Sequence, residues 1–309
     1  VVLDNGTPAG YSYASGSAVS ADAVKIGGGM GKIARGGQDT PKDEWTTSGM
    51  PCFAEGALYW EQFAGVDTTI TRNWEGDYTQ DYASRGAWTS MMKSEKGVPF
   101  DLSLAFHTDA GITPDDSIVG TLAIYTLLCD KERKYEDGRD RILARTYAKY
   151  VQDQVVNDIR SDFEPGWSRR KLWDKSYSEC RTTGVPGMIL ELLSHQNFAD
   201  MKYGLDPSFR FTVCRAVYKG MLKTLSEFYG CRYTVQPLPV NSFSAVMAGD
   251  SVRLSWCSTE DRKEPTAVPS GYVVYTRIDD GVFDKGREVT GSSISMAVTP
   301  GHIYSFKVA

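Results

Sequence analysis

Two apolar runs, each with a polar side chain in a costly position, constrain this chain most. The first covers residues 100–107 and ends at His107, and the second covers residues 187–194 and holds Glu191 between leucines. Both runs have the length of a strand, and the second reads as buried on both faces. An isolated carboxylate in such a strand is expensive to bury unless it takes up a proton. We therefore expect two strands of one sheet, with polar groups at its edge.

Strand-like and helix-like patterns alternate over residues 28–233. Apolar side chains recur every fourth residue from Tyr147 to Phe163 and predict a long helix. The last helix is expected to begin at Asp206, which is followed by proline, and to end at Gly230. Further strands are predicted at residues 68–72 and 121–126, and a further helix at residues 52–64. The alternation predicts an α/β fold with a mostly parallel sheet that is flanked by helices on both faces.

After Tyr233 the pattern changes to short alternating runs that are separated by turn residues. A Pro-Leu-Pro junction at residues 237–239 precedes them. The runs predict a small antiparallel β-sandwich over residues 235–309, which resembles a fibronectin type III module. Trp256 and Tyr304 are its expected core side chains. Such a module has one more strand than these residues provide, so the domain is expected to be incomplete.

The composition argues against two classes of partner. The 309 residues carry a net charge of −5 at pH 7, so there is no basic excess to neutralise nucleic-acid phosphates. No apolar run is long enough to span a bilayer. The six cysteines are scattered without a CxxC pair, which weighs against a zinc ribbon or a redox motif. Cys214 and Cys257 lie in apolar patterns and are predicted to be core thiols.

His107 ends its strand at the carboxyl edge, where open α/β sheets bind ligands. Alternation along the strand places Leu104 and Phe106 on one face and His107 on the other. The histidine either takes part in a ligand site or caps the strand by hydrogen bonding. Together with Glu191 it suggests a metal-assisted hydrolase, although one histidine and one glutamate do not complete a zinc site.

Glu191 carries the sharper chemical implication. Burial raises the pKa of a carboxyl group, and a general acid/base near neutral pH uses such a raised pKa. The alternative is an internal ion pair with Arg85 or Arg181. A second candidate stretch, Trp167–Trp173, mixes aromatic and basic residues and fits either sugar stacking or the solvated start of a helix.

The chain order of these features resembles a known family. A strand ending at His107, a second short strand, a long helix and the stretch Val185–Glu191, with Asn197 six residues on, look like the type 3 zinc-dependent N-acetylmuramoyl-L-alanine amidases. The resemblance implies that His107 binds zinc and that Glu191 is the catalytic acid/base. Asp109 stands where the family usually has asparagine.

Three further residues are expected to contact the substrate, namely His195, Asp109 and Arg85. His195 follows the Glu191 strand in a loop, where it either orients the substrate or caps the next element. The expected substrate is peptidoglycan or another cell-surface glycan.

Longer phrases resemble a subgroup of secreted bacterial proteins catalogued as xanthan lyases. The phrases lie at residues 77–86, 104–111 and 190–200. In that subgroup a golvesin-type β-sandwich is inserted into the amidase domain, and residues 1–27 resemble its last strands. The resemblance implies a golvesin-type tail at 1–27, an amidase-like domain at 28–233 and the fibronectin type III-like domain at 235–309. It also implies a secreted, periplasmic or cell-surface location.

One family feature has no counterpart in this sequence. The first zinc histidine of the family lies in a Gly-His-Gly turn that is followed by a glutamate ligand. Gly28–Gly31 contains no histidine, and Glu55 sits in an amphipathic helical pattern. We expect the remaining ligands upstream of Val1, or else a degenerate copy of the domain. Because three protein ligands are usual in catalytic zinc sites, this chain alone is expected to bind zinc weakly.

Three functions are compatible with these residues. The first is a zinc-dependent amidase that cleaves the lactyl amide of peptidoglycan. The second is a non-catalytic module that binds a glycan on an amidase scaffold. The third is a xanthan-type polysaccharide lyase, although no cluster of residues in the sequence commits to lyase chemistry.

Overall fold

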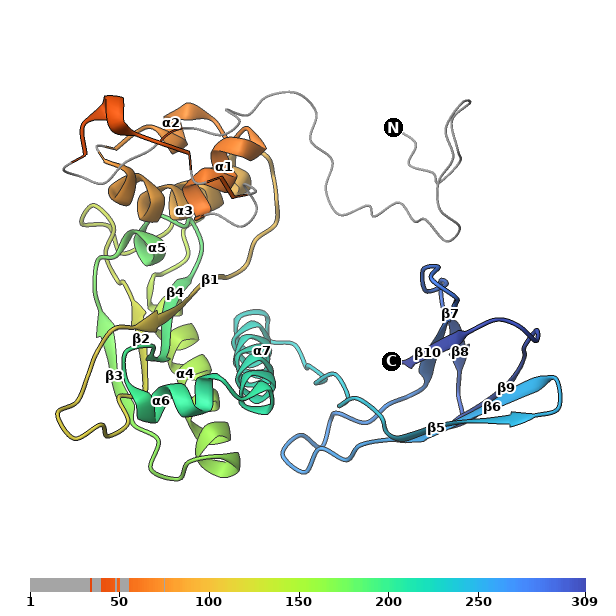
Figure 1. Ribbon diagram of the computed structural model, residues 1–309. Coiled ribbons are helices and arrows are strands. Elements are labelled where there is room, and N and C mark those ends of the chain that lie inside the picture. Colours follow the sequence, from red (N-terminus) through yellow and green to blue (C-terminus); the bar gives the residue numbers. More distant parts are fainter. Residues whose placement is uncertain (1–33, 35–39, 48, 51–55, 75) are drawn as a thin grey trace, which may run out of the picture. The chain divides into compact units, whose positions relative to one another are not determined.

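The computed structural model describes residues 34, 40–47, 49–50, 56–74 and 76–309 (Figure 1). These residues belong to two compact units, one within residues 25–233 and one that contains residues 234–309. The β-like runs of residues 1–27, the glycine stretch Gly28–Gly31, Glu55 and the predicted helix start at Cys52 lie outside the described residues.

The first unit alternates helices and strands, as the sequence predicts. In chain order its elements are the short 3-10 helix η1 (Lys42–Glu44), α1 (Ala57–Ala64), α2 (Thr68–Thr71), α3 (Asp77–Ser94), β1 (Ser103–Asp109), β2 (Thr121–Tyr125), α4 (Ile142–Asp162), β3 (Arg169–Asp174), α5 (Ser178–Arg181), β4 (Gly187–Ser194), α6 (Phe198–Gly204) and α7 (Pro207–Tyr229). The fold is therefore mixed α/β with helices flanking a sheet.

The sheet has the order β1-β4-β2-β3, and two of its three strand pairs are parallel, whereas the third is antiparallel. β1 pairs with β4 and β2 pairs with β3 in parallel, but β2 and β4 run antiparallel. The physical reason is the connection from β1 to β2. Residues 110–120 form no helix, and a parallel return needs a crossover of a dozen or more residues, usually helical. The chain therefore turns back at the same end of the sheet.

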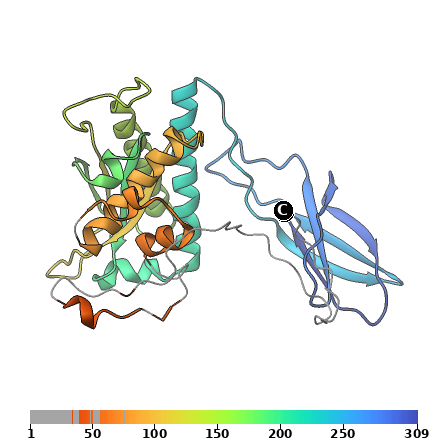
Figure 2. The same cartoon turned by 90° about the horizontal axis from the view of Figure 1, so that it is seen from above.

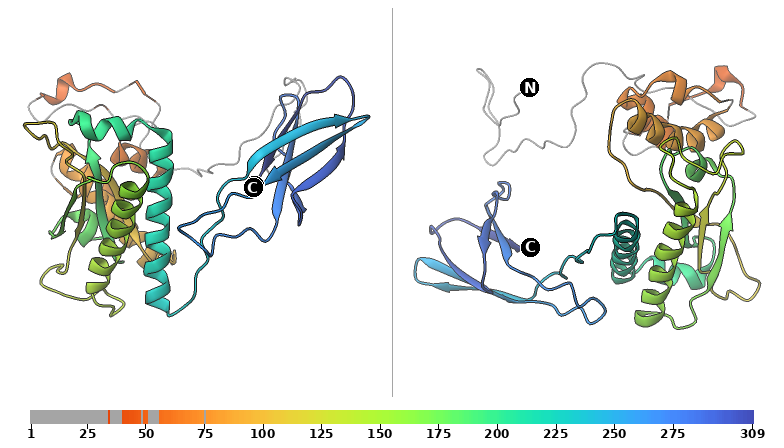
Figure 3. Two further views of the ribbon diagram at one scale, coloured as in Figure 1. Left: turned by 90° about the horizontal axis from the view of Figure 1, so that it is seen from below. Right: turned by 180° about the vertical axis from the view of Figure 1, so that it is seen from behind.

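Helices cover both faces of this sheet (Figures 1 and 3). α4 and α7 pack against each other and form the main core with the strand residues Met188 and Leu190. On the opposite face α5 contacts β2 and β4, and α3 packs on α5. A much smaller apolar cluster lies there, with Ile124, Cys180 and Ile189 at its centre.

The ends of α7 follow from the sequence. The Asp206 side chain accepts a hydrogen bond from the backbone N–H of Ser208 at 2.8 Å, and Gly230 ends the helix in the left-handed conformation. Gly220 allows α7 to approach α4 closely, because a Cβ atom there would lie 2.7 Å from the Cα atom of Val151. The helix-to-helix contact of the main core depends on this glycine.

Two local predictions are wrong. Residues 68–71, expected as a strand, form the helix α2, because the Asp67 carboxylate caps it by accepting from the Thr69 N–H at 2.8 Å. This cap outweighs the strand preference of a β-branched run. The stretch Trp167–Trp173 is not a helix start, and its first ring, that of Trp167, is not accessible to a sugar. It leads into β3, and Trp167 is fully buried in the main core.

The C-terminal unit consists of two three-stranded antiparallel sheets (Figure 2). Its strands are β5 (Asn241–Ala248), β6 (Ser251–Cys257), β7 (Tyr272–Ile278), β8 (Arg287–Val289), β9 (Ser293–Ala297) and β10 (Tyr304–Val308). The sheet orders are β5-β6-β9 and β10-β7-β8. Trp256 packs in the core, as expected, whereas Tyr304 is only half-buried and its hydroxyl accepts from the Thr299 N–H at 3.0 Å.

The cysteine prediction is also wrong, since both Cys214 and Cys257 are exposed. Cys257 is the last residue of β6, at an outward position of that strand, and Cys214 lies on an outward face of α7. An apolar sequence context does not by itself determine which face of an element a thiol occupies. Among the described residues, no helix combines the length and the apolar character that a membrane crossing requires.

Candidate active site

The register of the sheet brings the two polar strand residues together. β1 and β4 run parallel, and His107 is the register partner of Glu191. Two residues earlier on the same strands, Ala105 and Ile189 pack in the small apolar cluster with Cys180 of α5. Because side chains alternate along a strand, His107 and Glu191 project from that same face, toward α5.

His107 is held by a carboxylate from α5. Its Nε2 atom lies 3.0 Å from Oε2 of Glu179, whose side chain is 11% exposed. The other carboxylate oxygen of Glu179 accepts from Nη1 of Arg85 at 2.9 Å, and Arg85 also pairs with Asp81 on α3. Three charge-assisted contacts therefore connect α3 through α5 to the strand histidine.

These contacts shift the protonation of both partners. The hydrogen bond to Glu179 raises the pKa of His107, and burial opposes the shift. Burial alone would raise the pKa of Glu179, but the hydrogen bonds and charges of His107 and Arg85 outweigh it and lower that pKa. The pair is therefore charged across a wider range of pH than the separate groups.

Glu191 has the opposite environment. Burial raises the pKa of its carboxyl group, and the positive charge of His107 offsets only part of this effect. Its Oε2 atom is buried and has no hydrogen-bond partner among the described residues. The alternative ion pair with Arg85 is not formed, because the Arg85 guanidinium binds Asp81 and Glu179 instead. Glu191 is thus a carboxyl group with a free acceptor position and a tendency to hold a proton.

A cavity of about 630 Å³ opens over these groups. It is lined by Tyr78, Asp81, Tyr82, Arg85, His107, Ile124, Ser176, Tyr177, Ser178, Glu179, Arg181, Ile189 and Glu191. Three tyrosine rings and several hydroxyl groups therefore accompany the charged groups. A volume of this size is within the range of small-molecule sites.

The other predicted site residues divide between two places. Arg85 lines the cavity, and its two Nη groups bind the carboxylates of Glu179 and Asp81, so that Arg85 orients Glu179. Asp109 instead forms an ion pair with Arg170. His195 faces the end of β1, where its Nδ1 atom lies 3.1 Å from the Thr108 hydroxyl. Neither Asp109 nor His195 is among the residues that line the cavity.

A second carboxylate fixes the loop beyond β1. Asp200 is fully buried and accepts from the backbone N–H groups of Val119, Gly120 and Ser194 at 2.9, 3.2 and 2.8 Å. Asn197 donates to the Ser117 carbonyl at 3.1 Å and caps α6 through the Asp200 N–H. The loop of residues 110–120 is therefore tied across the ends of β4 and β2.

Sequence reasoning missed Glu179 entirely. α5 spans only Ser178–Arg181, which is too short for a periodic pattern, and Glu179 lies 72 positions after its partner His107. The sequence offers one weak indication of this contact, namely that Glu179 is a carboxylate located shortly before the buried strand β4.

The described residues do not fit a complete catalytic zinc site. Among them no group of three or more His, Cys, Asp or Glu side chains is placed to hold a metal ion. His107 directs its Nε2 atom to Glu179, so the histidine beside Glu191 already has a partner. Catalytic zinc usually takes three protein ligands.

No protein-family model and no curated protein sequence matches the chain. Among solved structures, it is similar to an N-acetylmuramoyl-L-alanine amidase from Clostridium difficile 630, with 13% identity and a TM-score of 0.34 over 45% of this chain and 63% of that one. The CwlD amidase of Clostridioides difficile, solved with the GerS lipoprotein, shares 14% identity with a TM-score of 0.37 over 50% of this chain and 68% of CwlD.

A third similar structure is the apo amidase Ami1 from Mycobacterium abscessus, with 17% identity and a TM-score of 0.34 over 45% of this chain and 61% of Ami1. The chain thus spans less than two thirds of the C. difficile 630 amidase and of Ami1.

Proposed function

We propose that this chain contributes the proton-transferring part of a cell-wall amide hydrolase, with Glu191 as the general acid/base. One observation carries the proposal. The Glu191 carboxyl group has a pKa raised by burial, has one buried oxygen without a partner, and faces a cavity beside an oriented histidine. A carboxyl group with a raised pKa and a free acceptor position is suited to accept a proton and to give it up again.

The residues divide the work of amide hydrolysis as follows. Ionised Glu191 takes a proton from the attacking water, so that the oxygen bonds to the amide carbon. Glu191 then gives this proton to the leaving nitrogen as the carbon–nitrogen bond breaks, which restores its ionised form. His107, oriented by Glu179, lies next to Glu191 on the neighbouring strand.

The proposed substrate is the lactyl amide of peptidoglycan, as the family resemblance implies. The cavity suits a sugar–peptide junction, because the rings of Tyr78, Tyr82 and Tyr177 lie next to charged groups that bind amides and hydroxyls. Under the same proposal the protein acts outside the cytoplasm, at the cell wall, and the C-terminal sheets form a fibronectin type III-like accessory module. The golvesin-type tail and the kinship with proteins catalogued as xanthan lyases belong to the proposal as well.

Zinc dependence is a separate part of the proposal. The resemblance implies a zinc ion at His107, but the described residues do not supply the ligand set, so the steps above pass through no metal. A zinc-dependent reaction therefore needs ligands from outside the described residues. Stem-peptide release that stops after chelation and returns when zinc is added back indicates a zinc-dependent reaction. Release that persists after chelation indicates a zinc-independent one.

The decisive experiment measures stem-peptide release from purified muropeptides. We expect Glu191→Gln to lower the rate by on the order of 100-fold or more, because Gln cannot exchange a proton. Glu136→Gln is the matched control, since Glu136 is exposed and does not line the cavity. Full activity of Glu191→Gln overturns the assignment. An unsaturated uronate released from xanthan establishes the lyase instead, and glycan binding without any turnover establishes the binding module.

A further inference from the structure

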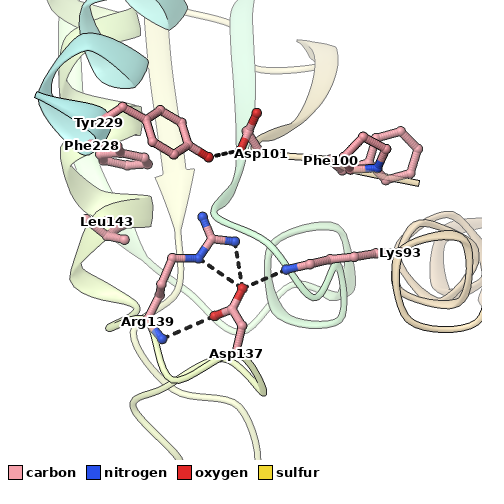
Figure 4. Close-up of a pocket in the computed structure, with 9 residues that line it drawn as sticks. Lys93, Phe100, Asp101, Asp137, Arg139, Leu143, Phe228 and Tyr229 are labelled. Atoms are coloured by element: carbon pink, nitrogen blue, oxygen red, sulfur yellow. Dashed lines mark hydrogen bonds and ion pairs between the residues drawn. The ribbon is translucent and has the colours of Figure 1, made fainter. Parts of the chain in front are cut away.

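A second hollow lies at the other end of α3 and β1 (Figure 4). It has a volume of about 430 Å³ and is built from the last turn of α3, the segment before β1, the turn before α4 and the end of α7. The lining residues are Lys93, Pro99, Phe100, Asp101, Asp137, Arg139, Leu143, Phe228 and Tyr229. None of them lines the cavity around Glu191.

The polar wall of this hollow is internally paired. Asp137 accepts from Nε of Arg139 at 2.9 Å and from Nζ of Lys93 at 2.7 Å, and Lys93 also donates to the Gly184 carbonyl at 3.1 Å. The Tyr229 hydroxyl donates to the Asp101 carboxylate (Figure 4). Two cations thus face two carboxylates, and the lining has no net charge.

The same hollow offers aromatic surface next to this wall. Phe100 and Phe228 are half-buried, and Tyr229 is 59% exposed at the end of α7. In Figure 4 the Arg139 guanidinium points toward the Tyr229 hydroxyl and the Asp101 carboxylate. A ligand in this hollow meets aromatic rings as well as carboxylate and guanidinium groups.

We propose that this hollow binds an uncharged sugar ring. A pyranose has apolar C–H faces that pack on aromatic rings and a rim of hydroxyl groups that both donate and accept hydrogen bonds. Donation to Asp137 or Asp101 and acceptance from Arg139 match that rim. An anionic ligand is disfavoured, because both cations already hold a carboxylate, and a wholly apolar ligand leaves the charged edges without water or a partner.

The placement indicates one unit of a polymer. Lys93 follows Arg85 by eight residues on α3, which corresponds to about 12 Å along the helix axis. Between the two hollows lies a third, of about 280 Å³, lined by Thr89 of α3 and by residues 103–107 of β1. Since β1 is an edge strand of the sheet, this side of the unit offers a track for a glycan chain that ends near Glu191. Only this polymer argument rests on the proposed function; the binding of a sugar ring does not.

The test is calorimetric titration of the full chain with a neutral tetrasaccharide of β-linked N-acetylglucosamine. We expect Tyr229→Ala to weaken binding about fivefold to tenfold, because the variant loses both the ring and the hydroxyl that orients Asp101. Tyr229→Phe, which keeps the ring, should retain most of the affinity. Phe198→Ala removes an aromatic ring that is 84% exposed on α6, away from the hollow, and serves as the control with unchanged affinity.

Several results would overturn the site. They are no binding by the native chain, equal affinity of Tyr229→Ala and the native chain, and tighter binding of a uronate tetrasaccharide than of the neutral one. Asp101→Asn provides a second variant that leaves α7 unchanged, and it should also weaken binding. If the native chain binds the tetrasaccharide but releases no stem peptide from muropeptides, the sugar site stands although the amidase proposal fails. If the native chain releases stem peptide but Tyr229→Ala binds the tetrasaccharide as tightly as the native chain does, the amidase proposal stands and the sugar site fails.

Discussion

The two faces of the sheet in the α/β unit are built for different purposes. The face under α4 and α7 is a large dry core in which side chains such as Val151, Leu190 and Phe209 are fully buried. The face under α5 has a small apolar cluster, and beside it lie Arg85, Glu179 and Glu191 with their charges. Stability is therefore concentrated on one face and reactive chemistry on the other.

This division explains why a costly carboxyl group is tolerated. Glu191 and the core residue Leu190 are neighbours on β4 and point to opposite faces. The burial of Leu190 anchors the strand, so that the strand holds Glu191 in place despite its unfavourable surroundings. Substitutions at adjacent positions of one strand should consequently have separate effects, one on folding and one on the reaction.

The largest expected effect on stability is at Leu190. Leu190→Ala leaves a cavity in the main core and should lower the free energy of unfolding by about 2–5 kcal/mol. The measurement is denaturant unfolding monitored by the helical signal in circular dichroism. All described helices lie in the α/β unit, so this signal reports on that unit. Leu205→Ala, at a residue that is 68% exposed, is the control and should change stability by less than about 0.5 kcal/mol. Equal losses in both variants would contradict the division between the faces.

A second prediction concerns Glu61 on α1. Burial raises the pKa of Glu61 to about 7, and its Oε2 atom is buried without a hydrogen-bond partner among the described residues. The folded chain holds this proton at pH values where the unfolded chain has released it, so stability falls as the pH rises from about 4.5 to 7. Glu61→Gln should therefore raise the free energy of unfolding by on the order of 1–3 kcal/mol at pH 8.

The same variant should leave stability unchanged at about pH 4, where Glu61 is protonated in both states. Glu136→Gln, at an exposed position, should have no effect at either pH. A Glu61→Gln variant that is less stable than the native chain at pH 8 would contradict this prediction. It would show that the ionised Glu61 carboxylate stabilises the fold through its attraction to Arg85.

The parts of the fold that the sequence predicts are those with local signals. β4 matches residues 187–194, and α7 has its expected cap and terminating glycine. The reversal between β2 and β4 left no trace in the apolar pattern, because buried strands read alike in either direction. α2 was missed because one capping side chain, Asp67, outweighs the preference of four following residues.

The candidate site shows the same limit. The proximity of His107 and Glu191 follows from two strand patterns and is found in the register of the sheet. The His107–Glu179 contact depends on how a four-residue helix packs against a strand far away in sequence, for which no periodic signal exists. The pairing of Lys93 with Asp137, 44 positions apart, depends on two connecting segments and is equally invisible in the sequence.

The smallest predicted effect tests the charged face by pH. The hydrogen bond from Glu179 raises the pKa of His107 above its ordinary value of 6.5. Protonated His107 therefore contributes its full stabilisation of the folded state below pH 6.5, and this contribution is lost as the pH rises through the raised pKa. The lowered pKa of Glu179 makes its contribution complete above 4.5 and lost as the pH falls through the lowered value. Glu179→Gln should therefore lower the free energy of unfolding most in the pH range where both groups are charged. The expected loss is about 0.5–1 kcal/mol, because His107 is 31% exposed to solvent.

Unfolding followed by helical circular dichroism at about pH 3, 5.5 and 8 measures this difference. The exposed pair of His302 and Asp279, 2.7 Å apart in the C-terminal unit, provides a matched histidine–carboxylate control. Asp279→Asn should leave the helical transition unchanged at every pH, because it lies in the all-β unit. If the Glu179→Gln difference were the same at all three pH values, the contact would act by shape and packing alone. The face under α5 would then be stabilised by packing, like the face under α4 and α7, and the proposed difference between the two faces would be wrong.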